Sequence, residues 1–225
     1  MTVGKKFVAV AGNVGVGKST LTGLLAERLN WEAFYEAVDD NPYLADFYRD
    51  MKSWSFHSQI YFLTRRLRHH RQLMGRPHSV IQDRSVYEDA EIFARNLYQQ
   101  GNMSERDWAS YQELYTVLTE FLPAPDMVIY LRASVNTLLA RIRKRGREFE
   151  QDIDPHYLHR LNLLYEDWIS RFALSPVLII PADDIDFVAH PAHLDLIQSK
   201  ILEKLEGKEE VFFLADEIAR AREAA

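Results

Sequence analysis

Apolar residues follow two alternating patterns along the 225 residues of the chain. Short runs rich in β-branched and aromatic residues predict strands, and longer segments with apolar residues every three to four positions predict helices. The predicted strands lie within "KFVAVAG", "WEAFYEAV", "HSVIQDRS", "PDMVIYLRA" and "PVLIIPA". Helices are predicted over residues 18–29, 41–51, 53–74, 88–99, 104–121, 135–146 and 155–172, and from residue 193 onward with a break at Gly207.

Strands that alternate with helices indicate βαβ units, which assemble into a parallel sheet covered by helices on both faces. We therefore predict an α/β fold with a five-stranded parallel sheet, as a single domain over residues 1–225. Ligands of such sheets bind beyond the carboxyl ends of the strands. Because they lie at or just after predicted strand ends, we expect four residues to converge on one edge: Gly12, Glu36, Asp83 and Arg132.

The composition excludes several classes of protein. The formal charge is −6, with acidic and basic residues mixed along the chain, which argues against a nucleic-acid partner. The chain has no cysteine, so disulfides, thiolate metal sites and a cysteine nucleophile are excluded. No segment approaches the roughly 20 apolar residues of a membrane span, and the first apolar run is too short for a secretory signal. We therefore expect a cytoplasmic protein with no membrane partner.

The segment after the first predicted strand matches G-x-x-x-x-G-K-[ST] and leads into a predicted helix, which is the context in which this motif binds phosphate. Its glycines allow backbone N–H groups to turn toward phosphate oxygens, and the helix N-terminus adds partial positive charge. Lys18 is expected to reach the β- and γ-phosphates, and the Ser19 hydroxyl a Mg²⁺ ion. The alternative is a glycine turn with a solvated lysine. We predict a nucleoside triphosphate site formed by Gly12, Asn13, Val14, Gly15, Val16, Gly17, Lys18, Ser19 and Thr20.

This loop alone does not identify the reaction, because GTPases, motor ATPases and small-molecule kinases all use it. The N-K-x-D sequence that reads guanine in GTPases does not occur in the chain. Motor ATPases usually carry a long apolar strand that ends in an acidic pair, and "SVIQDRS" matches that pattern poorly. These observations favour a small-molecule kinase.

Five further segments resemble the deoxyribonucleoside kinase family, and most of all its bacterial deoxyadenosine/deoxyguanosine kinases. They are "YEAVDDNPYLADFY", "WSFHSQIYFLTRRLRHHRQL", "QDRSVYEDAEIFARNLY", "IYLRASVNTLLARIRKRGREFEQDI" and "YLHRLNLLYEDWI", and the resemblance covers residues 6–188. One departure is that the family's E-P-V is Glu36-Ala37-Val38 here. The resemblance implies a P-loop kinase that transfers the γ-phosphate of ATP, with Mg²⁺, to the 5′-hydroxyl of a deoxyribonucleoside. It also implies a homodimer and makes purine deoxynucleosides the first choice of substrate.

The resemblance implies catalytic roles for three polar residues at strand ends. Glu36 would accept the proton of the 5′-hydroxyl, which agrees with the need for a carboxylate close to the phosphate loop. Asp83 would hold Mg²⁺ through water, and Arg84 would bridge Glu36 and the phosphates. The alternatives are an ordinary glutamate at a strand end, and a capping aspartate beside a surface arginine.

The acceptor pocket is also assigned by resemblance. Gln59 would read the base edge, because an amide donates and accepts together, and an ion pair between Arg66 and Asp89 would complete the base-reading end. Tyr48 and Glu150 would hold the 3′-hydroxyl of the sugar. Three aromatic residues either line the base pocket or pack in the core: Trp54, Phe56 and Phe93.

The basic segment "ARIRKRGRE" resembles the family's lid, over about residues 141–152, whose arginines close over the triphosphate. A solvated basic face or a nucleic-acid patch is the alternative, which the acidic net charge disfavours. The segment "PADDIDF" resembles the loop beside the adenine of the donor. The residues assigned to the donor in this way are Arg141, Arg145, Arg147, Asp186 and Phe187.

Several alternatives remain open at this stage. A pyrimidine deoxynucleoside such as deoxycytidine could be the acceptor, and a non-catalytic nucleotide-binding subunit could share the fold. A nucleoside monophosphate kinase would need a second phosphate clamp, for which His69, His70 and Arg71 are poor candidates. The apolar face of "DWASYQELYTVLTEFL" suits a dimer or the core equally well, and the helical tail over residues 207–225 could pack on the core or on a partner.

Overall fold

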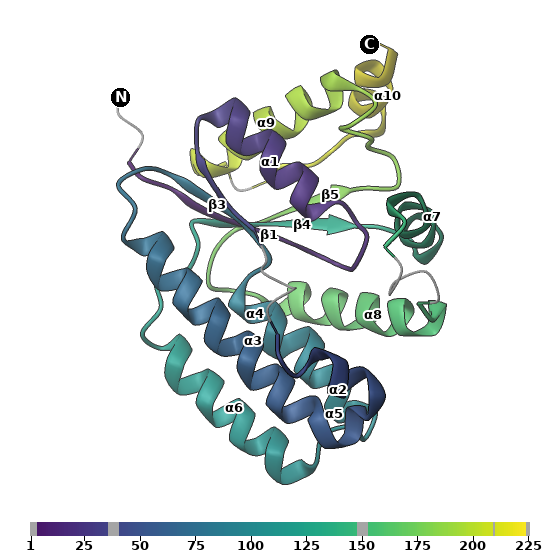
Figure 1. Cartoon of the computed structure of the whole chain (residues 1–225). Coiled ribbons are helices and arrows are strands. Elements are labelled where there is room, and N and C mark those ends of the chain that lie inside the picture. The colour runs from purple at the N-terminus through teal and green to yellow at the C-terminus, as the bar shows by residue number, and fades with distance from the viewer. Residues whose placement is uncertain (1–3, 36–40, 148–152, 209, 224–225) are drawn as a thin grey trace.

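The computed structural model describes residues 4–35, 41–147, 153–208 and 210–223 of the chain. The five predicted strands pair in one parallel sheet with the order β2-β3-β1-β4-β5, which confirms the predicted α/β fold (Figure 1). The strands are β1 (Phe7–Gly12), β2 (Glu32–Phe34), β3 (Val80–Asp83), β4 (Met127–Arg132) and β5 (Val177–Pro181).

Helices cover both faces of this sheet. Figure 1 shows α1 and α9 on one face, and α3, α6 and α8 on the other. None of the described helices is long and apolar enough to span a membrane. The helices are α1 (Lys18–Leu29), α2 (Leu44–Arg49), α3 (Met51–Met74), α4 (Val86–Glu88), the π-helix η1 (Asp89–Ala94), α5 (Arg95–Gln99), α6 (Glu105–Thr119), α7 (Val135–Arg145), α8 (Pro155–Arg171), α9 (Pro191–Leu205) and α10 (Ala215–Glu223).

The central strand β1 shows why only the strand ends are open to a ligand. All six of its residues are buried. Successive side chains of a strand point to opposite faces. Val8 and Val10 accordingly pack in the core beneath α1 and α9, whereas Ala9 and Ala11 pack in the core beside α3 and α8. Because helices cover both faces, the carboxyl edge of the sheet is where polar side chains can gather.

The structure differs from the sequence-based prediction in two elements. The helical segment predicted over residues 88–99 is confirmed, but it is not one regular α-helix, because α4, the π-helix η1 and α5 follow one another there. The π-helix begins at Asp89, which pairs with Arg66 of α3, and single π-helical turns are frequent at functional sites. The strand β2 is shorter than its apolar run suggested, and residues 36–40 lie outside the described part of the chain.

The predicted break in the tail is confirmed at Gly207, whose φ is 98°. The tail packs on the rest of the chain, because Ile218 of α10 is buried in the same core as Ile197 and Ile201 of α9. The structure thus decides between the two packings that the sequence left open.

One buried carboxyl group connects three elements at the carboxyl edge of the sheet. Glu88 is fully buried. Its Oε1 accepts a hydrogen bond from the Gly12 N–H at 3.2 Å, and its Oε2 accepts from the Ser85 N–H at 2.8 Å and the Ser85 hydroxyl at 3.2 Å. The hydroxyl of Tyr165 lies 2.8 Å from Oε1. Glu88 therefore links the end of β1, the start of α4 and the middle of α8.

The hydrogen bonds around Tyr165 indicate the protonation state of Glu88. The Tyr165 hydroxyl lies 2.8 Å from Gly12 O as well as from Glu88, yet it has one proton to donate. If Tyr165 donates to Gly12 O, a protonated Glu88 can donate to Tyr165 and still accept from the Gly12 N–H. Burial raises the pKa of Glu88 and outweighs the nearby charges of Arg84 and Lys18. The folded protein therefore keeps the Glu88 carboxyl group protonated to a higher pH than the unfolded chain does.

This assignment predicts a pH-dependent effect of Glu88→Gln. An unfolded chain releases the Glu88 proton near the ordinary pKa of about 4.3, whereas the folded protein retains it to a higher pH. The folded state then binds more protons, so the stability that Glu88 contributes falls as the pH rises through this window. We expect the difference in unfolding free energy between wild type and Glu88→Gln, from urea unfolding between about pH 5 and pH 8, to shrink with pH.

Glu203→Gln is the matched control. Hydrogen bonding to Lys208 lowers the pKa of Glu203, so its contribution is already complete above the ordinary pKa and should stay constant over the same range. A wild-type advantage over Glu88→Gln that grows with pH would show that Glu88 is ionised in the folded protein.

Candidate functional site

The loop between β1 and α1 has a backbone that requires glycine. The φ angles are 81° at Gly15 and 107° at Gly17, a region that L residues rarely adopt. A Cβ on Gly15 would lie 2.4 Å from Cγ1 of Ile142 in α7. Gly17 precedes α1 without a side-chain cap, so the first N–H groups of this helix can bind an anion.

Hydrogen bonds from the side chains of Lys18 and Asn13 stabilise the conformation of the loop. Lys18 is buried, and its Nζ donates to Gly12 O at 2.8 Å and to Asn13 O at 3.1 Å. The Asn13 amide donates to Leu158 O at 2.9 Å and to Asn162 Oδ1 at 2.8 Å, both on α8. The lysine charge is therefore kept within the loop. In the same loop, Val14 is partly buried and Val16 is buried.

The first turn of α1 meets the end of β3. The Ser19 hydroxyl donates to Oδ2 of Asp83, while Thr20 beside it is exposed. Oδ1 of Asp83 is buried and has no hydrogen-bond partner among the described residues. A hydroxyl, one carboxylate and adjacent phosphate oxygens form the kind of ligand set that Mg²⁺ uses. Among the described residues, no group of three or more histidine, aspartate or glutamate side chains is arranged to hold a metal ion.

Arg84 follows Asp83 in a left-handed backbone conformation with φ 66°. Its backbone N–H donates to Val10 O at 3.0 Å, which continues the pairing of β3 with β1. Its guanidinium stacks over the ring of Phe93, 4.2 Å from the ring centroid. An uncommon conformation of this kind marks a position over-determined by its surroundings. The predicted partner Glu36 lies outside the described residues.

The predicted base-reading residues lie on α3 and η1. Arg66 and Asp89 form a buried two-pronged ion pair, with Nε–Oδ2 at 3.1 Å and Nη2–Oδ1 at 3.4 Å. Gln59 on the same helix is buried. A buried amide is costly unless a polar partner satisfies it, so this position suits a polar ligand.

The predicted sugar contacts are described only in part. Tyr48 in α2 is 57% exposed, with its ring 5.3 Å from that of Phe47, and Glu150 lies outside the described residues. The aromatic residues Trp54 and Phe56 of α3 are partly buried. Trp54 stacks on the ring of Tyr43, with 5.8 Å between the centroids.

The arginine-rich helix α7 contacts the phosphate loop through Arg141. Arg141 donates to Val16 O at 2.6 Å and to Ala182 O at 2.7 Å, so it ties the loop to the end of β5. Arg145 and Arg147 are exposed, and residues 148–152 lie outside the described part. Arg132, at the end of β4, pairs instead with Glu166 of α8 at 2.6 Å.

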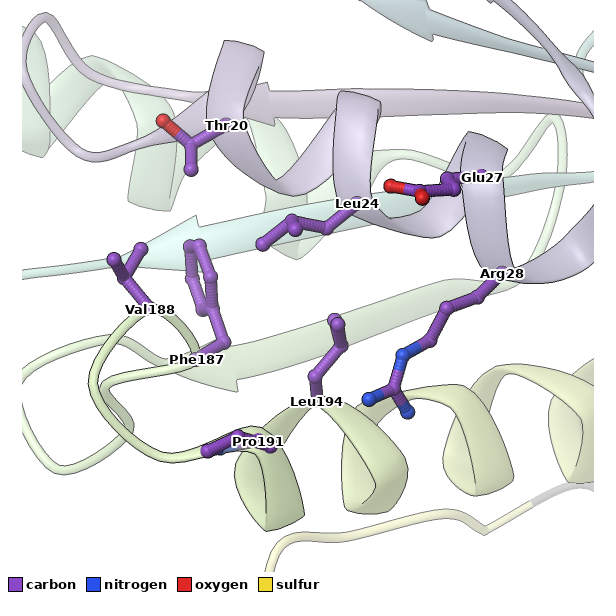
Figure 2. A pocket seen from close by; sticks show the side chains of 8 residues that line it. All are labelled: Thr20, Leu24, Glu27, Arg28, Phe187, Val188, Pro191 and Leu194. Carbon is purple, nitrogen blue, oxygen red and sulfur yellow. The ribbon is translucent and has the colours of Figure 1, made fainter.

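A groove of about 380 Å³ opens between α1 and α9 next to the phosphate loop. Figure 2 shows the ring of Phe187 projecting into it from the segment after β5, with Thr20 on the opposite side. Phe187 is otherwise buried, and Asp186 before it accepts hydrogen bonds from the N–H groups of Val188 and Ala189 at 3.0 and 2.9 Å. The lining residues are Thr20, Leu24, Glu27, Arg28, Phe187, Val188, Pro191 and Leu194.

Sequence reasoning missed Glu88 and Tyr165, which hold the first glycine of the loop in place. A local signal for Glu88 existed, because Ser85-Val86-Tyr87-Glu88 is a capping box of the S-x-x-E type, and the structure contains both of its hydrogen bonds. No local signal marks Tyr165, whose partner lies 77 positions away in sequence.

Comparison with known proteins places this site in a family. The family model described as deoxynucleoside kinase matches residues 8–206. The deoxyadenosine/deoxycytidine kinase of Bacillus subtilis (strain 168) is 42% identical over 196 residues, which cover 86% of this chain and 90% of that protein. The deoxyadenosine kinase of Lactobacillus acidophilus is 39% identical over 207 residues, which cover 88% and 95% respectively.

A solved structure shares the fold of this chain over most of its length. The deoxyadenosine kinase from M. mycoides with bound dATP superposes with a TM-score of 0.77 at 33% identity, over 88% of this chain and 99% of that one. The sequence comparison and the fold comparison thus point to the same group of enzymes. This chain combines that fold with the loop after β1, the Ser19–Asp83 contact and the buried Arg66–Asp89 pair. This chain belongs to the deoxynucleoside kinase family.

Proposed function

We propose that this enzyme transfers the γ-phosphate of ATP to the 5′-hydroxyl of a purine deoxyribonucleoside, either deoxyadenosine or deoxyguanosine. The observation that carries the proposal is the hydrogen bond between Ser19 and Asp83, next to Lys18 of the phosphate loop. The second carboxylate oxygen of Asp83 is buried and has no hydrogen-bond partner among the described residues. Relatives named deoxyadenosine kinase and deoxyguanosine kinase, 39% and 35% identical, support the choice of purine. Nucleotide salvage in the cytoplasm, without a nucleic-acid or membrane partner, belongs to the same proposal.

The donor half of the reaction uses groups already in place around the loop. The loop N–H groups and the α1 N-terminus bind the phosphates, and Lys18 exchanges its carbonyl partners for phosphate oxygens. Ser19 and Asp83 would hold Mg²⁺, which when bound neutralises charge on the phosphate oxygens. Arg141, Arg145 and Arg147 would close over the triphosphate as a lid. Asp186 and Phe187 would lie beside the adenine.

The acceptor half needs a proton acceptor and a sugar clamp. Glu36 is the proposed base for the 5′-hydroxyl, and Arg84 would bridge it to the transferring phosphate. Tyr48 and Glu150 are the proposed partners of the 3′-hydroxyl. Because phosphoryl transfer forms no covalent enzyme intermediate in this scheme, positioning and charge neutralisation supply most of the rate.

The base is proposed to bind at Gln59 and the Arg66–Asp89 pair. The pair is buried and internally neutral, so it can present a fixed pattern of donors and acceptors to a base without adding net charge. Gln59 is buried and carries a donor and an acceptor on one amide. Together they can recognise a purine edge.

Deoxycytidine is a second candidate acceptor, because the 42% identical relative is named a deoxyadenosine/deoxycytidine kinase. A nucleoside monophosphate kinase is less well supported. His70, one of the candidates for its second phosphate clamp, is buried with Nε2 3.1 Å from Pro123 O, and burial lowers the pKa of its imidazole. The Lys18, Asp83 and Arg84 side chains gathered at the loop also argue against a non-catalytic subunit.

We also propose that the enzyme is a homodimer that pairs through α6. This helix exposes Leu114 and Val117 at 38% and 49% of their surface, and Phe121, just after its end, is 79% exposed. Core packing does not account for these three residues, whereas a second copy could cover them.

A panel of acceptors tests the proposed function directly. With ATP and Mg²⁺, we expect deoxyadenosine or deoxyguanosine to give a 5′-monophosphate with a higher kcat/KM than any other of the four deoxynucleosides and four ribonucleosides. Chromatography of the products measures this. Faster turnover of nucleoside monophosphates, or no turnover of any nucleoside while ATP still binds, would reject the proposal.

Lys18→Ala should lower kcat by about 10²-fold or more, because it removes a charge that contacts the transferring phosphate while the loop backbone remains. Circular dichroism should show an intact fold. Lys208→Ala is the matched control, because Lys208 lies on the surface and pairs with Glu203, and its kcat should equal that of the wild type. Near wild-type turnover of Lys18→Ala would contradict its role.

Gln59→Leu should raise the KM for the deoxynucleoside about tenfold, because a hydrogen bond to a bound ligand is lost, and should leave the KM for ATP unchanged. A purely structural Gln59 predicts the opposite result, namely an unchanged KM and higher stability, since leucine removes a buried polar group. Gln72→Leu, at an exposed position of the same helix, controls for the general effect of the substitution.

A further inference from the structure

The C-terminal helix α10 packs on α9, beyond the family match that ends at residue 206 (Figure 1). Ile218 is buried between the two helices. Lys200 of α9 donates to Oε1 of Glu217 at 3.0 Å, and Oε2 of Glu217 accepts from the Leu214 N–H at 3.2 Å. The start of α10 is therefore held by burial, an ion pair and a cap.

His193 connects α10 to the segment that follows β5. It is fully buried on α9. Its Nε2 lies 3.1 Å from Ile218 O, and because a carbonyl can only accept, Nε2 carries the proton. Its Nδ1 is then the acceptor for the Asp186 N–H at 3.0 Å, and it also lies 3.3 Å from Asp186 O. One imidazole thus bridges α10 and Asp186.

Arg222 forms a second connection at the other end of α10. Its Nη2 donates to Asp184 O at 2.9 Å, two residues before Asp186. The segment held in this way also carries Phe187, whose ring packs against the phosphate loop: a Cβ on Gly17 would lie 3.3 Å from Phe187 Cζ. In Figure 2 the Phe187 and Val188 side chains form one end of the groove beside α1.

We propose that α10, acting through His193 and Arg222, positions residues 184–187 against the base of the phosphate donor and so sets the affinity for ATP. This inference rests on the proposed function, in which Asp186 and Phe187 lie beside the adenine. The helix acts on the donor alone, because α9 and α10 lie on the opposite face of the sheet from α3, which carries Gln59 and Arg66 (Figure 1). His193 and Arg222 are positioning residues that need not touch the nucleotide.

Arg222→Ala tests this role against Arg220→Ala. Arg220 is exposed on the same helix, and its guanidinium contacts Asp216 of its own turn. We expect Arg222→Ala to raise the Kd for ATP, measured by calorimetry, by about two- to tenfold, the range for one lost hydrogen bond. The Kd for inorganic tripolyphosphate, which has no base, and the KM for the deoxynucleoside should stay unchanged. Arg220→Ala should match the wild type in all three measurements.

His193→Asn provides a second, independent variant. The asparagine oxygen can replace Nδ1 as acceptor for the Asp186 N–H, but the side chain is too short to reach Ile218 O. We therefore expect a loss of ATP affinity at least as large as that of Arg222→Ala, with tripolyphosphate binding unchanged. Wild-type ATP affinity in a folded Arg222→Ala protein, or an equal loss for tripolyphosphate, would overturn the inference. A wild type that binds ATP but phosphorylates no nucleoside would reject the proposed function, while the calorimetric comparison would still decide this inference.

Discussion

A buried carboxyl group needs partners for its polar atoms, and Glu88 takes its partners from three separate segments of the chain. Gly12 ends β1, Ser85 follows β3, and Tyr165 comes from α8. Moving any one of these segments would leave a buried polar atom without a partner, at a cost of about 1–3 kcal/mol for each atom. The phosphate loop and the segment after β3 are therefore fixed relative to each other.

The protonation of Glu88, which burial favours, matters as much as its hydrogen bonds. An ionised carboxylate at the base of the loop would repel a bound triphosphate and offset the charge of Lys18. A protonated carboxyl group makes the same connections without that repulsion. The cationic groups Lys18 and Arg84 then remain available to phosphates, and the carboxylate of Asp83 contacts Ser19, the other residue proposed to hold Mg²⁺. Phosphoryl transfer requires the positioning of groups and the neutralisation of charge, and the contacts around Glu88 serve both requirements.

The sequence predicted features that depend on local patterns. The five strands, the phosphate loop and the break at Gly207 follow from apolar runs and glycines, and the resemblance supplied the Arg66–Asp89 pair. It did not predict the π-helix, because apolar spacing over a short segment cannot distinguish a π-turn from an α-turn. It also missed the Glu88–Tyr165 contact, which joins residues 77 positions apart and exists only through packing. The proposed roles of Glu36 and Glu150 remain predictions.

His193 shows the same limit at the far end of the chain. A lone histidine in an apolar helix is expected to be a core residue, and nothing in its neighbourhood along the sequence indicates a second role. Its two ring nitrogens have different partners, Asp186 N–H and Ile218 O, and both bonds are withdrawn from water. A buried bond is stronger than an exposed one such as that of Arg222, because no water competes for it. The histidine is therefore the stronger connection between the C-terminal helix and the donor side of the site, and Arg222 adds a second connection that the segment also needs.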